Sequence, residues 1–138
     1  MSQFGAKTFF SCKVANDEGG HFYVKELGQH NVETNLSAER EEGTTGRCLV
    51  MVTPDAERTM LTSLGISQLV STDELHYDAL SASTYAYTEG YLVTSPSAKS
   101  AVLELKRHAK EAGGKFAMTF SDPAMGGCFS EGTNDVRG

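Results

Sequence analysis

The segment from residue 85 to residue 120 constrains the fold of this 138-residue chain more than any other part of the sequence. Residues 85–93 and 115–120 each have the length and apolar content of a strand, and the stretch between them has helical periodicity. Ser95-Pro96 is typical of a helix start and Gly113-Gly114 of a helix end. A strand, a helix and a strand predict two parallel strands joined by a right-handed crossover, as in α/β folds. The residues expected on the buried face of this helix are Ala98, Ala101, Val102, Leu105, Ala109 and Ala112.

The sequence predicts a strand and a helix near the N-terminus. Residues 7–14 alternate as in a strand, and Asn16 or Asp17 can cap a helix that Gly28 closes. Residues 33–43 are charged and poor in apolar side chains, so we expect a solvated connection there.

Turn and capping residues mark the remaining elements. The apolar runs 45–53 and 58–62 flank Pro54-Asp55, which predicts a β-hairpin. Residues 71–74, Ser-Thr-Asp-Glu, have the spacing of a capping box and predict a short helix after them. Gly126, Gly127 and Gly132 follow Pro123, so we expect any C-terminal helix to be weak.

Composition excludes several classes of partner. The chain has 12 Lys and Arg against 18 Asp and Glu, a net charge of −6 without a basic run, which argues against nucleic acid. The longest apolar run, residues 48–52, is far too short to cross a membrane, and no signal peptide is evident. Three cysteines without a CxxC pair fit a reduced protein. We therefore expect a soluble, cytoplasmic protein.

Common catalytic and metal-binding motifs are absent from the sequence. It contains no P-loop, GxGxxG, HExxH or GxSxG pattern. None of the four histidines lies three or four residues from another histidine or a cysteine, so no metal site is expected. Cys48 lies within a predicted strand, where a small buried side chain is a better interpretation than a nucleophile.

Four stretches of the sequence resemble segments of one known protein family. They occur in the same order as in that family and have similar turn residues. They are Ala15-Asn16-Asp17-Glu18-Gly19-Gly20, the hairpin with its continuation Leu64-Gly65-Ile66, Glu89-Gly90-Tyr91, and Ser121-Asp122-Pro123. On these residues the chain resembles the ribokinase-like (PfkB) carbohydrate and nucleoside kinases, most closely their adenosine-kinase-like branch. The first stretch resembles the family's glycine-aspartate-glycine turn, with Ala15 in place of the first glycine.

The resemblance implies a partial ribokinase-like three-layer α/β sandwich with parallel central strands and a β-hairpin lid. Residues 1–138 would form a single partial kinase domain, with the lid at about 45–62 and the βαβ core at about 84–121. Family members are much longer, so the chain is expected to be an internal fragment.

The resemblance also implies which segments lie elsewhere. A Gly-Gly-x-x-x-Asn segment that grips the sugar would precede Met1, and an Asn-x-x-Glu segment associated with magnesium would follow Gly138. A Gly-Ala-Gly-Asp segment is absent too; its aspartate accepts the hydroxyl proton while helix amides stabilise phosphate charge. We therefore expect ATP and Mg²⁺ only with the complete enzyme, and neither a cofactor nor a catalytic residue in this chain.

Four residues are expected to contact a sugar or nucleoside. By resemblance, Cys48 and Val50 face the substrate from the lid, and Tyr91 offers its ring to a base or a sugar face. Arg58, near the hairpin turn, is expected to approach the substrate or a neighbouring lid. The acceptor could be adenosine, ribose, fructose or another polyol.

Two functions follow from these expectations. The first is a kinase fragment that is inactive in isolation. The alternative is a non-catalytic binding or assembly module derived from the kinase fold. Since lid strands with free edges invite pairing, a homodimer through residues 48–62 is also expected.

Overall fold

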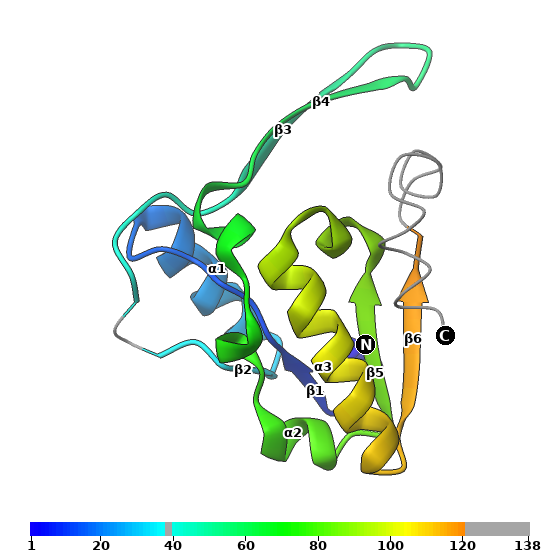
Figure 1. Cartoon of the computed structure of the whole chain (residues 1–138). Helices are drawn as coiled ribbons and strands as arrows, with labels where there is room; N and C mark the ends of the chain where they lie inside the picture. Colours follow the sequence, from blue (N-terminus) through cyan, green and yellow to red (C-terminus); the bar gives the residue numbers. More distant parts are fainter. Residues whose placement is uncertain (38–39, 121–138) are drawn as a thin grey trace. The chain divides into compact units, whose positions relative to one another are not determined.

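A computed structural model describes residues 1–37 and 40–120 of the chain. The chain divides into two compact units, Met1–Gln68 and Leu69–Gly138. The described strands form three two-stranded sheets, two of them parallel and one antiparallel (Figure 1). Parallel pairs with helical connections confirm the α/β class that the sequence predicts.

The first unit begins with a small parallel strand pair. In chain order it contains η1 (Ser2–Phe4, a 3₁₀ turn), β1 (Thr8–Phe10), α1 (Glu18–Gln29) and β2 (Val32–Thr34). Thr8 lies opposite Val32 in the parallel register. The predicted cap is confirmed, since the Asp17 side chain accepts a hydrogen bond from Gly20 N at 2.8 Å.

Three expectations for this region need correction. The first strand covers only three residues rather than 7–14, and the helix ends at Gln29 rather than at Gly28. Residues 33–43 are not wholly a solvated connection, because β2 runs into them. Asn31, with φ of 53°, adopts the left-handed conformation that asparagine tolerates at helix ends, and the chain enters β2 directly after it.

The predicted hairpin is confirmed. β3 (Arg47–Val52) pairs in antiparallel fashion with β4 (Arg58–Ser63), and every residue of both strands is exposed. Thr53 N donates to Glu57 O at 3.0 Å across the turn. Figure 1 draws the hairpin as an arm that leads away from α1. A 3₁₀ turn, η2 (Gly65–Leu69), follows it.

The second unit contains the predicted βαβ crossover. In chain order its elements are η3 (Thr72–Glu74), α2 (Tyr77–Ser81), β5 (Tyr85–Glu89), η4 (Gly90–Thr94), α3 (Pro96–Glu111) and β6 (Lys115–Thr119). β5 and β6 are parallel, with Tyr85 opposite Lys115. Val93 and Val102 form one buried cluster, and a second consists of Leu80, Ala86 and Ala109.

The structure corrects three expectations for the second unit. β5 ends at Glu89 rather than at residue 93, because the chain turns into η4 at Gly90. The capping box is present, but it closes a single 3₁₀ turn, and His76 caps α2 instead. Ala112, expected on the buried face of α3, is exposed. The segment expected after Pro123 lies outside the described residues.

Candidate functional site

The hairpin gathers three of the four expected substrate contacts on one face. Side chains alternate between the two faces of a strand, and cross-strand partners share a face. Val50 lies opposite Met60 and Val52 opposite Arg58. Cys48, Val50 and Arg58 therefore lie on the same face, which we call the Val50 face; its other members are Val52, Met60 and Thr62.

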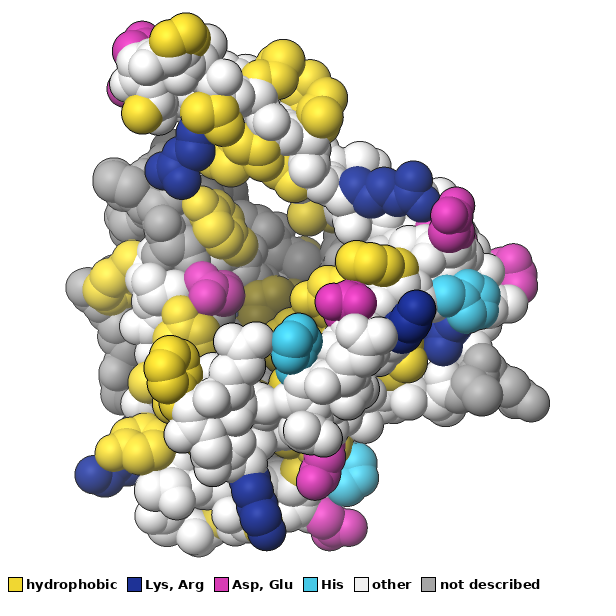
Figure 2. Space-filling model, turned by 180° about the vertical axis from the view of Figure 1, so that it is seen from behind, with side chains coloured by type: hydrophobic (Ala, Val, Ile, Leu, Met, Phe, Trp, Pro, Cys, Tyr) yellow, Lys and Arg dark blue, Asp and Glu magenta, His cyan; other side chains and the backbone are white. Residues whose placement is uncertain are grey.

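The other side of the hairpin is apolar as well. Leu49 lies opposite Leu61, and Met51 shares their face, which we call the Leu61 face. The exposed fractions of Leu49, Met51 and Leu61 are 62%, 47% and 57%. Hydrophobic side chains can be seen gathered along the hairpin in Figure 2. Exposed apolar side chains on both sides of a two-stranded ribbon are typical of an interaction surface.

Cys48 is exposed, so the interpretation of this residue as a small buried side chain is wrong. Its Sγ lies 3.3 Å from Thr62 Oγ1 on the paired strand. The expectation assumed that an apolar strand would be covered by a sheet or a helix. The hairpin has no such cover within the described residues, so its apolar sequence reflects a surface open to partners.

Tyr91, the fourth expected contact, belongs to the second unit. It lies on η4 rather than at a strand end, with an exposed fraction of 49%. The hydroxyl of Thr94 donates to Tyr91 O at 2.8 Å. Tyr91 thus follows directly on the carboxyl end of β5, the edge of a parallel sheet where α/β proteins bind ligands.

Sequence reasoning missed a polar pair at the end of the same strand. The Tyr87 hydroxyl donates to Glu89 Oε1 at 2.8 Å. This hydrogen bond, with desolvation as a smaller cause, raises the pKa of the Tyr87 phenol. Side-chain alternation along β5 is the signal that could have found the pair, since residues two apart share a face.

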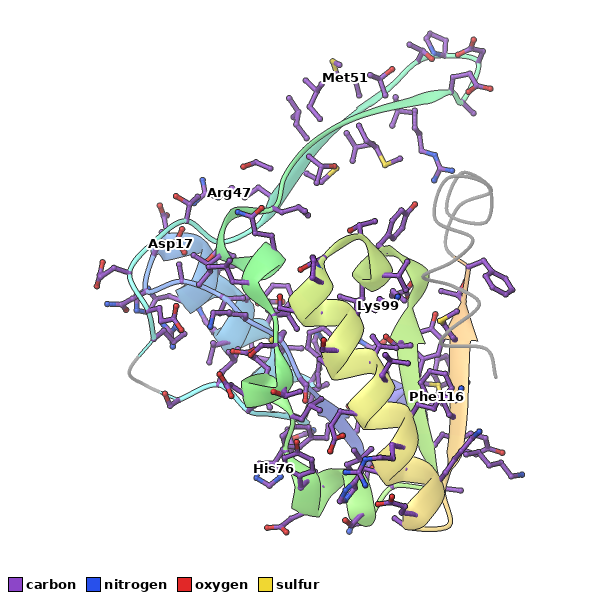
Figure 3. The ribbon with its side chains drawn as sticks, in the orientation of Figure 1. Asp17, Arg47, Met51, His76, Lys99 and Phe116 are labelled. Carbon is purple, nitrogen blue, oxygen red and sulfur yellow. The ribbon has the colours of Figure 1, made fainter. Side chains whose placement is uncertain are left out.

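A second missed group lies at the base of the hairpin, around Asp17. Asp17 Oδ1 accepts from Thr45 Oγ1 at 2.5 Å, and Asp17 Oδ2 accepts from Thr45 N at 3.0 Å. Arg47 Nη2 lies 3.3 Å from Asp17 Oδ2. Figure 3 shows Asp17 and Arg47 together where the hairpin leaves the unit. The hydrogen bonds from Thr45 and Gly20 hold the pKa of the Asp17 carboxyl far below its usual range.

The described residues do not provide a site for a metal ion. Among residues 1–37 and 40–120, no three His, Cys, Asp or Glu side chains form a group that could hold one. No helix within the same ranges is long and apolar enough to span a membrane.

The chain is similar to several known kinases in sequence and in fold. A model of the pfkB family carbohydrate kinases matches residues 1–136. Ribokinase of Mus musculus is 24% identical over 108 residues, 78% of this chain and 33% of the mouse protein. The crystal structure of adenosine kinase from Sinorhizobium meliloti has a TM-score of 0.85 at 30% identity, covering 93% of this chain and 39% of that one. An E. coli protein described as a putative ribokinase II, solved in complex with ATP and Mg²⁺, shares the fold with a TM-score of 0.85 at 16% identity, covering 98% of this chain and 44% of that one.

These matches agree with the parallel strands and mixed α/β content of the structure. The chain spans about a third of the length of mouse ribokinase and about two-fifths of the adenosine kinase chain. It has the fold of part of a ribokinase-like sugar or nucleoside kinase. Since the family model covers residues 1–136, the chain belongs to the pfkB family of carbohydrate kinases.

Proposed function

We propose that this chain supplies the lid and a substrate-facing strand end of a kinase that transfers a phosphoryl group from ATP to a sugar or nucleoside hydroxyl. The observation that carries the proposal is the Val50 face, because Cys48, Val50 and Arg58 all lie on this one side of an exposed hairpin. Its apolar side chains suit a sugar or base face, and Arg58 suits a polar group at the rim. We also propose that the two units are parts of one kinase domain.

The proposed role of the lid is physical rather than chemical. A lid that closes over the acceptor removes water and holds the hydroxyl in line with the terminal phosphate of ATP. Cys48, Val50 and Tyr91 would contact the substrate without moving a proton. We propose that ATP and Mg²⁺ bind only to the complete enzyme, because the sequence lacks the Gly-Ala-Gly-Asp segment that the family resemblance associates with phosphoryl transfer.

An assay of phosphoryl transfer by the 138-residue chain alone tests whether the chemical step needs the rest of the enzyme. A general base and a phosphate-binding helix start each raise the rate of phosphoryl transfer by orders of magnitude, and the chain is expected to lack both. Radiolabelled ATP incubated with the chain and ribose, fructose or adenosine should give no labelled product above the protein-free control. Turnover of about 1–100 s⁻¹, as in ordinary kinases, would show that the chain carries its own chemistry.

We also propose that the chain forms a homodimer through the hairpin. The Leu61 face supports this, because Leu49, Met51 and Leu61 are exposed on the side away from Cys48 and Val50. Leu61→Lys should convert a dimer to a monomer in light scattering, whereas Val50→Lys, on the Val50 face, should leave the dimer intact. A monomer mass at every concentration of the unaltered chain would refute the dimer.

The alternative function, a non-catalytic binding or assembly module, is favoured by the same apolar hairpin. Sequencing the gene beyond both ends of these 138 residues separates the two proposals. Kinase sequence continuing on both sides would support the enzyme. Start and stop signals at the two ends would favour the module. We place either protein in the cytoplasm, since Cys48 is an exposed thiol that suits a reducing compartment.

A further inference from the structure

The Asp17 carboxylate links the start of α1 to the base of the hairpin. Asp17 is the N-cap of α1, and Thr45 lies two residues before β3 begins. Both oxygens of the carboxylate bond to Thr45, one through the hydroxyl and one through the backbone N–H. The same Oδ1 also accepts from Gly20 N. Asp17 therefore joins the start of the helix to the start of the hairpin.

Thr45 is held on its other side as well. Its side-chain oxygen accepts from Ala15 N at 3.0 Å, so the hydroxyl both donates and accepts. Thr45 is buried, with an exposed fraction of 6%, whereas every residue of β3 and β4 is exposed. Buried hydrogen bonds of this kind are costly to leave unmade. The change from a buried base to an exposed arm takes place between Thr45 and Arg47.

Close packing leaves this base no room to shift. A Cβ placed on Gly20 would lie 2.0 Å from Ala15 O and 3.1 Å from Thr45 Oγ1. The return strand is fixed nearby, since Ile66 N donates to Thr44 O at 3.0 Å and Ser67 Oγ donates to Lys13 O at 3.0 Å. Because the residues at the base of the hairpin are tightly packed, their position determines the direction of β3 and β4.

We propose that Asp17 is a positioning residue that fixes the direction of the hairpin lid through Thr45. The inference rests on the proposed function, because only a lid that covers a substrate needs a fixed direction. Arg47, the first residue of β3, adds an ion pair to Asp17 Oδ2 and restrains the arm one step further out. Asp17 does not touch the substrate in this proposal; it acts through the hairpin.

Distances between spin labels on the hairpin and on α1 test the proposal without any substrate. The parent carries cysteines at Thr59 and Lys25, both exposed, with the three native cysteines replaced by serine. Thr45→Val removes the hydroxyl at nearly constant volume. Asp17→Ser keeps a side chain that can cap α1 but is too short to hold Thr45. Thr45→Ser restores the hydroxyl and is the conservative rescue.

A matched control removes a similar clamp that does not involve the hairpin. Asn35 accepts from Cys12 N at 2.9 Å and donates to Cys12 O at 3.0 Å in the same unit. Asn35→Ala should therefore lower stability and leave the label distances unchanged.

The parent, Thr45→Ser and Asn35→Ala should show one narrow distance peak. Thr45→Val and Asp17→Ser should lose that peak and give a broad distribution. The proposal is overturned if both keep the parent's peak, or if Asn35→Ala broadens as much as they do. If Asp17→Ser does not fold, Thr45→Val against Thr45→Ser decides alone. Because no substrate is present, failure here is distinct from failure of the proposed kinase function.

Discussion

At the scale of single residues, Asp17 shows how a local signal conceals a distant role. Its position before α1 predicts a helix cap, and the structure confirms the cap. The hydrogen bonds to Thr45 span 28 residues and could not be read from any local pattern. Cys48 shows the reverse case. An apolar strand predicted burial, but the strand belongs to an exposed hairpin.

The carboxyl of Asp17 makes stability depend on acid pH. Its pKa in the folded protein lies below the ordinary value of 3.8, chiefly because of the Thr45 hydroxyl. A lowered pKa contributes stability that is present above 3.8 and is lost as the pH falls through the folded pKa. The free energy of unfolding should therefore drop between about pH 4 and pH 2, and the drop should be smaller in Asp17→Asn. Urea unfolding followed by circular dichroism at each pH measures both, and equal drops would contradict the assignment.

Ala56 in the hairpin turn is a second residue with a predictable effect. Its φ of 68° lies in the left-handed region, which costs a residue with a Cβ about 1 kcal/mol relative to glycine. Ala56→Gly should slow amide exchange at Thr53, whose N–H bonds across the turn, by about fivefold. Ala112→Gly is the control, because φ of Ala112 is −78° and a glycine at this position relieves no backbone strain. Unchanged exchange at Thr53 in Ala56→Gly would exclude strain at this turn.

At the scale of elements, helices and strands were predicted well where they are long and where capping or turn residues mark their ends. α3 has Pro96 at its start and Gly113-Gly114 beyond its end, and both predicted ends agree with the structure to within one or two residues. β2 has only three residues, and its pairing partner β1 lies beyond a whole helix. Such a strand exists because of parallel pairing, which sequence periodicity does not report. β5 was predicted too long, because its apolar run continues through η4.

The packing of α3 can be tested by a pair of neighbouring residues. Val102 is buried with an exposed fraction of 2% and packs against Val93, whereas Leu103 is 37% exposed. Val102→Ala should lower the free energy of unfolding by about 2 kcal/mol through lost burial and a cavity. Leu103→Ala removes more atoms but should cost less than about 0.5 kcal/mol. Chemical denaturation compares them, and equal losses would mean that this face of α3 is not the buried one.

At the scale of the whole molecule, the sequence was sufficient to identify the family but not the contacts within the candidate site. Turn residues and element order are local features, and they carried the resemblance that the match over residues 1–136 confirms. The two faces of the hairpin emerge only from the register of β3 with β4. The acceptor was not predictable, because recognition of a particular sugar depends on polar groups arranged in three dimensions and not on family membership.

The proposed function requires the Val50 face of the hairpin to contact a sugar or nucleoside. Methyl-labelled protein titrated with adenosine, ribose and fructose, and observed by NMR, tests it directly. At least one ligand should shift the methyl signals of Val50 and Met60 while those of Leu49 and Leu61 stay in place. Shifts confined to Leu49 and Leu61, or no methyl shift on the hairpin with any of the three ligands at saturating concentration, would show that the Val50 face does not contact the acceptor.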